Sequence, residues 1–178
     1  IAVSADQKVS DTGELQERLA ANAAEQQAAN DQAAAEAAEQ KAAKDEAAVD
    51  LSGVACIGDS VMLGSSGELR KVLPGCIIDA EVSRYVGGGL DAAKEMAAQG
   101  RLGKNVVIAL GTNGPIAGYE KYEVQTRALL EYLGPDRHIF WVNVYCPELS
   151  WQQTNNDYLV SMAKDHPNVT IVDWYGLV

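Results

Sequence analysis

Val54-Ala55-Cys56-Ile57-Gly58-Asp59-Ser60-Val61-Met62 is the stretch that decides the fold. Its first four residues are apolar and are followed by Gly58, which predicts a short buried strand. The residues from Val61 to Leu73 have helical spacing, so Ser60 lies where a strand passes into a helix. A serine in such a turn projects from the carboxyl edge of the sheet, near helix N–H groups that stabilise negative charge. The pattern fits a nucleophilic serine, and it fits equally a helix start capped by Asp59 and Ser60.

A second strand-to-turn motif follows further along the chain. Residues 105–110, Asn-Val-Val-Ile-Ala-Leu, predict another buried strand that runs directly into Gly111-Thr112-Asn113-Gly114. In a parallel sheet this turn lies at the same carboxyl edge as Ser60, where open α/β sheets place their ligands. The Asn113 amide would then be a hydrogen-bond donor beside a nucleophile, as an oxyanion hole requires. An ordinary Asn-Gly turn is the alternative.

Strands and helices alternate regularly over residues 53–178. The patterns predict strands at residues 54–58, 76–82, 105–110, 139–144 and 169–173. They predict helices near residues 66–73, 90–99, 119–133 and 151–164. We therefore expect an α/β fold with three layers, in which a five-stranded parallel sheet has the flavodoxin-like strand order.

The two motifs together resemble the SGNH (GDSL-type) hydrolase superfamily. The stretch 57–62 and the closing Val172-Asp173-Trp174-Tyr175 are similar to the C-terminal extracytoplasmic domain of bacterial peptidoglycan O-acetyltransferases. The resemblance covers residues 53–178. It implies that Ser60 is the nucleophile and a backbone oxyanion donor, and that Asn113 is a side-chain oxyanion donor. A further backbone donor, often Gly in the family, corresponds to Ser83.

The family's catalytic Asp and His, which lie in an Asp-x-x-His motif after the last strand, have no counterpart in this chain. The sequence holds two histidines, His138 and His166, and both precede predicted strands. Both therefore fall at the amino edge of the sheet, opposite Ser60. A serine without a base is a weak nucleophile. We expect the chain to be a C-terminally truncated domain whose catalytic Asp and His lie beyond Val178.

The first 50 residues differ in composition from the rest. They are rich in Ala, Glu, Gln, Asp and Lys, contain no aromatic residue, Pro or Cys, and carry a net charge of −7 of the chain's −11. We expect residues 1–10 to be disordered or extended and residues 11–52 to form an Ala-rich helical spacer. Self-association through this helix is the alternative. The acidic balance and the lack of a basic patch argue against nucleic-acid binding.

The remaining motifs point to no cofactor and no metal. Gly87-Gly88-Gly89 lacks the spacing of a nucleotide-binding fingerprint, and the three cysteines form no Cys-x-x-Cys pair. One disulfide would suit an extracytoplasmic domain, but the sequence does not select its pair. The candidate pocket residues beside the catalytic ones are Asp59, Gly111, Cys146 and Asp173. We expect Asp173 to cap a turn or bond a loop, or else to support the absent histidine. The aromatics that could stack on sugar rings are Trp151, Tyr158, Trp174 and Tyr175, with Tyr158 and Trp174 alternatively in the core.

The resemblance implies acetyl transfer to a hydroxyl of a cell-wall glycan through an acyl-enzyme. The acetyl donor would be delivered by a membrane acyltransferase domain, so that the domain is extracytoplasmic and anchored to the cell membrane in the full-length protein. The present chain contains no apolar run long enough to span a bilayer and is expected to be soluble as given. The alternatives are an SGNH esterase that uses water as acceptor and a non-catalytic glycan-binding domain.

Overall fold

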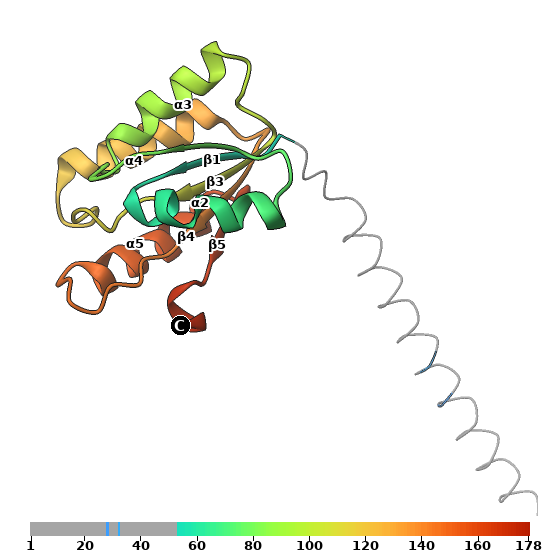
Figure 1. Cartoon of the computed structure of the whole chain (residues 1–178). Coiled ribbons are helices and arrows are strands. Elements are labelled where there is room, and N and C mark those ends of the chain that lie inside the picture. Colours follow the sequence, from blue (N-terminus) through green and yellow to red (C-terminus); the bar gives the residue numbers. More distant parts are fainter. Residues whose placement is uncertain (1–27, 29–31, 33–52) are drawn as a thin grey trace, which may run out of the picture. The chain divides into compact units, whose positions relative to one another are not determined.

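The computed structural model of the chain describes residues 28, 32 and 53–178. Ala28 and Gln32 are helical and exposed. Apart from these two residues, the predicted segments 1–10 and 11–52 lie outside the described residues. Residues 53–178 form the α/β domain drawn in colour in Figure 1.

The domain alternates strands and helices in the predicted order. Its strands are β1 (Ala55–Gly58), β2 (Ile77–Ala80), β3 (Asn105–Ala109), β4 (His138–Val142) and β5 (Val169–Val172). Its helices are α2 (Ser60–Val72), α3 (Gly88–Ala98), α4 (Glu120–Leu133), α5 (Gln152–Asp165) and the short 3-10 helix η1 (Tyr175–Leu177). All strand pairs are parallel, in the order β2-β1-β3-β4-β5. This is the flavodoxin-like order, so the predicted fold is confirmed.

Alternate strand residues face two separate cores, because successive side chains of a strand point to opposite faces of the sheet. On one face Ile57, Ile108 and Trp141 are fully buried among residues of α3, α4 and α5. On the other face Cys56 packs with Met62 of α2 in a smaller cluster. Figure 1 shows α2 lying over the sheet near β1 and β3, and α3 and α4 running side by side. The sheet is thus the middle of three layers.

Helix α2 agrees with the helical spacing that begins at Val61 and is longer than the range near residues 66–73. It starts at Ser60 and continues through Gly64 and Gly67. A Cβ at either glycine would meet nothing within 4 Å, so both lie on an open face of the helix. Glycine weakens a helix interior by roughly 1 kcal/mol relative to alanine, and packing of the opposite face on β1 and β2 compensates here.

The predicted strands are slightly longer than the observed ones at their carboxyl ends. Asn143 and Asp173 were expected to belong to strands, but both lie just after them. The Nδ2 atom of Asn143 donates to Oδ1 of Asp173 at 2.7 Å, so these side chains bond each other beyond the last backbone pairs. Among the described residues, no helix combines the length and the apolar character that a membrane crossing requires.

The three cysteines are free thiols in different environments. Cys56 and Cys76 are buried in the smaller core, whereas Cys146 is partly exposed in the loop after β4. Burial, followed by the neighbouring Cys76 thiol, raises the pKa of Cys56 to about 12. Since only the thiolate is strongly nucleophilic, the Cys56 thiol is unreactive in the folded protein near neutral pH.

We predict that the native chain near pH 8 reacts with a thiol-specific disulfide reagent at Cys146 and leaves Cys56 and Cys76 unmodified. Burial and the high pKa of Cys56 keep that thiol protonated, and Cys76 is shielded in the same cluster. Peptide mapping after labelling reports the modified positions, and Cys146→Ser should abolish the fast reaction. Denaturant should expose the other two thiols. Rapid labelling of Cys56 in the folded protein would contradict this packing.

Candidate active site

The strand register brings the two predicted turns together. Gly58 of β1 pairs with Ala109 of β3, so both strands reach the carboxyl edge at the same level. The N–H of Asp59 donates to the carbonyl of Ala109 at 3.2 Å and extends this pairing by one step. Ser60 and the turn that contains Asn113 therefore leave the sheet as neighbours.

Gly58 is required by the sharp reversal from β1 into α2. A Cβ at this position would overlap the side chain of Met62, one turn into the helix. The absence of a side chain allows α2 to begin directly above the strand. This places Ser60 at the first helical position, where backbone N–H groups have no partner within the helix.

Asp59, not Ser60, caps helix α2. Its side-chain Oδ1 accepts from the N–H of Val61 at 2.9 Å, and its side chain is buried. Burial raises the pKa of Asp59, while the N–H of Val61 and the hydroxyl and N–H of Thr112 act in the opposite direction. Its Oδ2 atom nevertheless has no hydrogen-bond partner of good geometry among the described residues. Asp59 thus connects the two turns, and capping leaves the Ser60 hydroxyl available for chemistry.

Ser83 lies in the loop after β2 with a φ of +62°. Among the described residues it is the one non-glycine residue in this left-handed region, which glycine adopts at least cost. The conformation accounts for the glycine that the resembling family often carries here. Replacement of Gly by Ser keeps the backbone N–H that the predicted donor role requires.

Asn113 is held against the same loop. Its Nδ2 donates to the carbonyl of Arg84 at 3.2 Å. An amide nitrogen carries two hydrogens, so the second remains for another acceptor. The three predicted donors, Ser60, Ser83 and Asn113, therefore belong to segments that are joined by direct hydrogen bonds.

Arg84 stabilises this arrangement through its guanidinium, a role that was not predicted from the sequence. Its side chain is 10% exposed, and its guanidinium donates to the carbonyls of Gly58 at 3.3 Å and Asp79 at 2.7 Å. It also forms an ion pair with the Asp79 carboxylate at 2.7 Å. One side chain thus ties the carboxyl ends of β1 and β2 to the loop that contains Ser83.

Three buried amides of α5 hold the loops after β3 and β4. Asn155 donates from Nδ2 to the carbonyls of Gly111 (2.9 Å) and Gly114 (3.0 Å), and its Oδ1 accepts from the N–H of Ile116 at 2.7 Å. Asn156 bonds both backbone groups of Val144. Gln152 accepts from the N–H of Cys146. These three residues were not predicted from the sequence. The available signal was amides spaced three and four apart on a helix that must bury one face.

Of the other candidate pocket residues, Gly111 and Cys146 lie in the loops after β3 and β4, and Asp173 follows β5. Gly111 belongs to the turn itself, with φ +128°, and a Cβ there would approach Val144 Cγ2 to 3.0 Å. Cys146 lies in the loop after β4. Asp173 follows β5, on the far side of β3 and β4 from β1, and accepts from Asn143 and from the N–H of Gly176 at 3.0 Å. These bonds agree with the predicted turn-capping role. Because β5 is three strand spacings of roughly 4.8 Å from β1, Asp173 lies about 14 Å from β1.

Both histidines lie at the amino edge, as predicted. His138 is the first residue of β4, and His166 is the C-cap of α5 just before β5. Neither can reach Ser60 across the length of the sheet. Within the described part of the chain, no group of three or more His, Cys, Asp or Glu side chains is placed to hold a metal ion.

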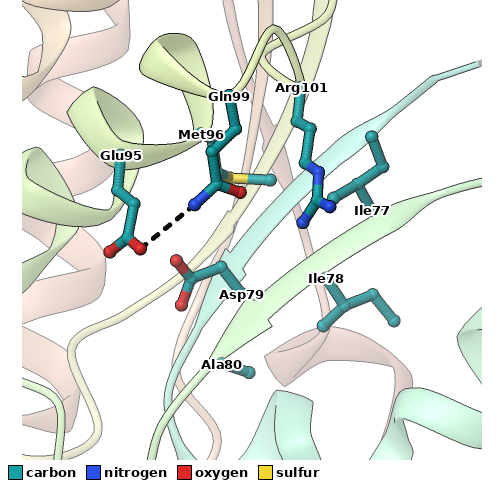
Figure 2. Close-up of a pocket in the computed structure, with 8 residues that line it drawn as sticks. All are labelled: Ile77, Ile78, Asp79, Ala80, Glu95, Met96, Gln99 and Arg101. Carbon is teal, nitrogen blue, oxygen red and sulfur yellow. Dashed lines mark hydrogen bonds between the residues drawn. The ribbon is translucent and has the colours of Figure 1, made fainter.

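A cavity beside β2 contains no residue of this site. It has a volume of about 290 Å³ and is lined by β2 and by residues of α3 and the following loop, including Asp79, Glu95, Gln99 and Arg101. Figure 2 shows the polar ends of these side chains gathered beside the outer edge of β2, with Gln99 bonded to Glu95. The cavity lining includes no serine, threonine or cysteine.

The predicted sugar-stacking aromatics are also distributed unevenly. Trp151 is partly buried and donates from Nε1 to the carbonyl of Thr112 at 3.2 Å, so it supports the turn. Tyr158 packs against the larger core, whereas Trp174 is exposed and is not a core residue. Tyr175 is exposed and lies beside Tyr145, with ring centroids 6.1 Å apart.

Comparison with known proteins finds several sequence relatives, three of which are described below. The chain is 37% identical over 122 residues to YrhL of Bacillus subtilis, whose name assigns peptidoglycan O-acetylation only provisionally. It is 34% identical over 120 residues to the peptidoglycan O-acetyltransferase OatA of Listeria monocytogenes, and 31% identical over 123 residues to the O-acetyltransferase OatA of Staphylococcus aureus. These matches cover 67–68% of the chain but only 18–19% of the relatives. The chain thus spans less than a fifth of their length. No protein-family model matches it.

The fold of the domain is also similar to that of solved structures. The C-terminal catalytic domain of peptidoglycan O-acetyltransferase A of Streptococcus pneumoniae, solved with a methylsulfonyl adduct, matches with a TM-score of 0.62 and 27% identity over 71% of each chain. The esterase EstA of a Pseudoalteromonas species matches with a TM-score of 0.50 and 15% identity over 67% of this chain and 77% of its own, a likeness of fold alone. The expected resemblance to SGNH hydrolases and to the C-terminal domain of peptidoglycan O-acetyltransferases is confirmed.

We predict that Ser83→Gly raises the free energy of unfolding by about 0.5–1 kcal/mol, because glycine relieves the left-handed strain at φ +62°. Ser83→Val should lower it by ~1 kcal/mol or more, since a β-branched residue disfavours this conformation most. Denaturant unfolding measures both variants. A less stable Ser83→Gly protein would mean that the serine side chain contributes contacts that outweigh the strain.

Asn155→Leu should lower the free energy of unfolding by about 2–4 kcal/mol, because three buried backbone groups lose their partner. Hydrogen exchange at short labelling times should accelerate at the Ile116 amide. Asn168→Ala is the matched control, since Asn168 also bonds two carbonyls but at the amino edge. The control should cost less stability and leave the exchange of residues 111–116 unchanged. Equal effects of the two variants on that turn would contradict the assigned role of Asn155.

Proposed function

We propose that this relative of the peptidoglycan O-acetyltransferase C-terminal domains transfers an acetyl group to a hydroxyl of a cell-wall glycan through an acyl-enzyme on Ser60. The supporting observation is the placement of Ser60 at the unpaired start of α2, beside a turn whose Asn113 amide is bonded to the loop of Ser83. The relatives named as O-acetyltransferases support the reaction class.

In the first step the Ser60 Oγ attacks the carbonyl carbon of the acetyl donor, and its proton passes to a base. The carbonyl oxygen gains negative charge, which the N–H groups of Ser60 and Ser83 and the amide of Asn113 stabilise. Collapse of this intermediate expels the donor's leaving group, which takes the proton from the base, and leaves acetyl-Ser60. In the second step the base, now free again, takes the proton of a glycan hydroxyl as that hydroxyl attacks the acetyl carbon. The second intermediate then releases the acetylated glycan, and Ser60 Oγ takes the proton back from the base.

The base is assigned to a histidine outside residues 1–178, oriented by an aspartate of the same Asp-x-x-His motif. Two observations support this assignment. Both histidines of the chain lie at the amino edge, and the sequence relatives are more than five times as long as the matched segment. The 178-residue chain would then form the acyl-enzyme far more slowly than a protein that contains the motif.

The same proposal extends to the organisation of the whole protein. Residues 11–52 would act as an Ala-rich spacer between this domain and a membrane acyltransferase domain that supplies the acetyl group. Residues 53–178 would then be the extracytoplasmic, C-terminally truncated SGNH-like domain. The composition of residues 1–50 and the length of the relatives support this arrangement.

The test compares the chain with a version continued along its native reading frame to include the proposed Asp-x-x-His. After incubation with an activated acetyl ester, intact mass should show one added acetyl group in the longer protein. Ser60→Ala should abolish this adduct, and Asn113→Ala should slow its formation by roughly 10²–10³-fold. Ser65→Ala, an exposed serine on the same helix, is the matched control and should react normally.

An acetyl adduct that persists in Ser60→Ala, or an Asn113→Ala protein of undiminished rate, would overturn these roles. Equal rates in the short and the long protein would show that the base is not in the added segment. Addition of a muramoyl-containing oligosaccharide then separates the acceptors. Acetylated sugar supports a transferase, whereas free acetate alone supports an esterase.

A further inference from the structure

Three tyrosines form an aromatic surface at the carboxyl edge, where the segments that lead into α3 and α4 meet. Tyr85 follows β2 by a few residues, and Tyr119 and Tyr122 lie at the start of α4. The rings of Tyr85 and Tyr122 are stacked, with centroids 6.2 Å apart and planes 13° apart. The Tyr119 ring lies 6.1 Å from that of Tyr122. These three residues are here called the tyrosine surface.

The two outer tyrosines are available to a ligand. Tyr85 is 49% exposed and Tyr119 is 57% exposed, although both rings contact Tyr122. Tyr122 is the support, because it packs against the larger core and carries the Lys121 ammonium 5.5 Å from its ring centroid. Large exposed aromatic side chains that adjoin one another are unusual on a protein surface unless they bind something.

The tyrosine surface continues directly from the proposed site. The Tyr85 ring lies over Gly114, where an added Cβ would come within 2.6 Å of its Cε1 atom. Gly114 follows Asn113, and Tyr85 is two residues from Ser83. A ligand bound on the Tyr85 ring would therefore lie next to the proposed oxyanion donors. The segment that follows Tyr85 is also tightly packed, since a Cβ at Gly87 would lie 2.5 Å from the Gln125 side chain.

We propose that Tyr85 and Tyr119 bind a pyranose ring of the acceptor glycan, one sugar away from the hydroxyl that is acetylated. One face of a pyranose ring consists of C–H groups, which pack on an aromatic ring, while the tyrosine hydroxyls remain free to bond its polar edge. The Lys121 ammonium beside Tyr122 suits a carboxylate-bearing sugar such as a muramoyl residue. This inference rests on the proposed function for the identity of the ligand, but not on the chemistry at Ser60.

Two other places on the domain fit a sugar less well. The cavity beside β2 is lined by charged and aliphatic side chains without an aromatic ring, and none of its residues belongs to the proposed site. The Tyr145–Tyr175 pair is exposed, but its rings are tilted by 50° and it adjoins the turn of Asp173, which follows the edge strand β5. This pair is the rival that the experiment must separate.

The experiment measures binding by calorimetry in the Ser60→Ala background, so that no acetyl transfer takes part. The probe is a tetrasaccharide of alternating N-acetylglucosamine and N-acetylmuramic acid. Tyr85→Ala and Tyr119→Ala should each raise the Kd by roughly three- to tenfold. Tyr85→Phe should retain most of the affinity because the aromatic ring is kept. Tyr132→Ala, a partly exposed tyrosine farther along α4, is the matched control and should bind normally. Thermal unfolding of each variant verifies that it is folded.

The outcomes distinguish this inference from the proposed function. Loss of affinity in Tyr85→Ala and Tyr119→Ala supports the tyrosine surface even if Ser60 never forms an acetyl adduct. Loss in Tyr145→Ala with normal binding in Tyr85→Ala would place the sugar at the rival pair and overturn the inference. Failure of the Ser60→Ala protein to bind the tetrasaccharide at millimolar concentration would overturn it as well.

Discussion

The parallel pairing of β1 with β3 is the constraint on which the rest of the domain depends. Because Gly58 and Ala109 are in register, both central strands release their chains at the same height. Helix α2 and the Gly111–Gly114 turn then start side by side, and Asp59 bridges them by its backbone to β3 and by its carboxylate to α2. A shift of one residue would reverse every side chain of β1 between the two cores and would displace Ser60 from Asn113.

The loops at this edge need outside support, since backbone pairing with the sheet ends within one residue of the strands, at Asp59 and Asn143. Helix α5 supplies it through Gln152, Asn155 and Asn156, which bond backbone groups that would otherwise be buried without partners. Each such orphaned group costs about 1–3 kcal/mol. The buried amides therefore act on the site by fixing the backbone of the loops after β3 and β4, although none of them is proposed to touch the substrate.

The sequence was sufficient to predict the strand order, the approximate element boundaries and the sheet edge at which the turns of Ser60 and Asn113 lie side by side. This success follows from buried parallel strands, which read as continuous apolar runs ended by glycine or polar residues. It was not sufficient to predict the roles of Arg84 and Asn155, because a buried polar side chain is recognised by its partners. These include Gly58, 26 residues from Arg84, and Gly111, 44 residues from Asn155. The same limit applies to Tyr85 and Tyr122, whose stacking depends on how α4 packs beside the loop after β2. Strand ends were overestimated at Asn143 and Asp173, where backbone pairing ends with the bond from the Asn143 N–H to the carbonyl of Val172 and the two side chains bond each other.

In the loop after β2, three consecutive residues have three different structural roles. Ser83 presents a backbone N–H in a left-handed conformation, Arg84 fixes the loop to the ends of β1 and β2, and Tyr85 lays its ring over Gly114. The left-handed turn at Ser83 is what allows this division, since a reversal of the backbone lets Arg84 point back under the sheet edge while Tyr85 faces the start of α4. The Arg84 carbonyl then receives the Asn113 amide. The Arg84 guanidinium thus fixes the backbone of the loop that carries both the proposed oxyanion donor and the proposed sugar-binding ring.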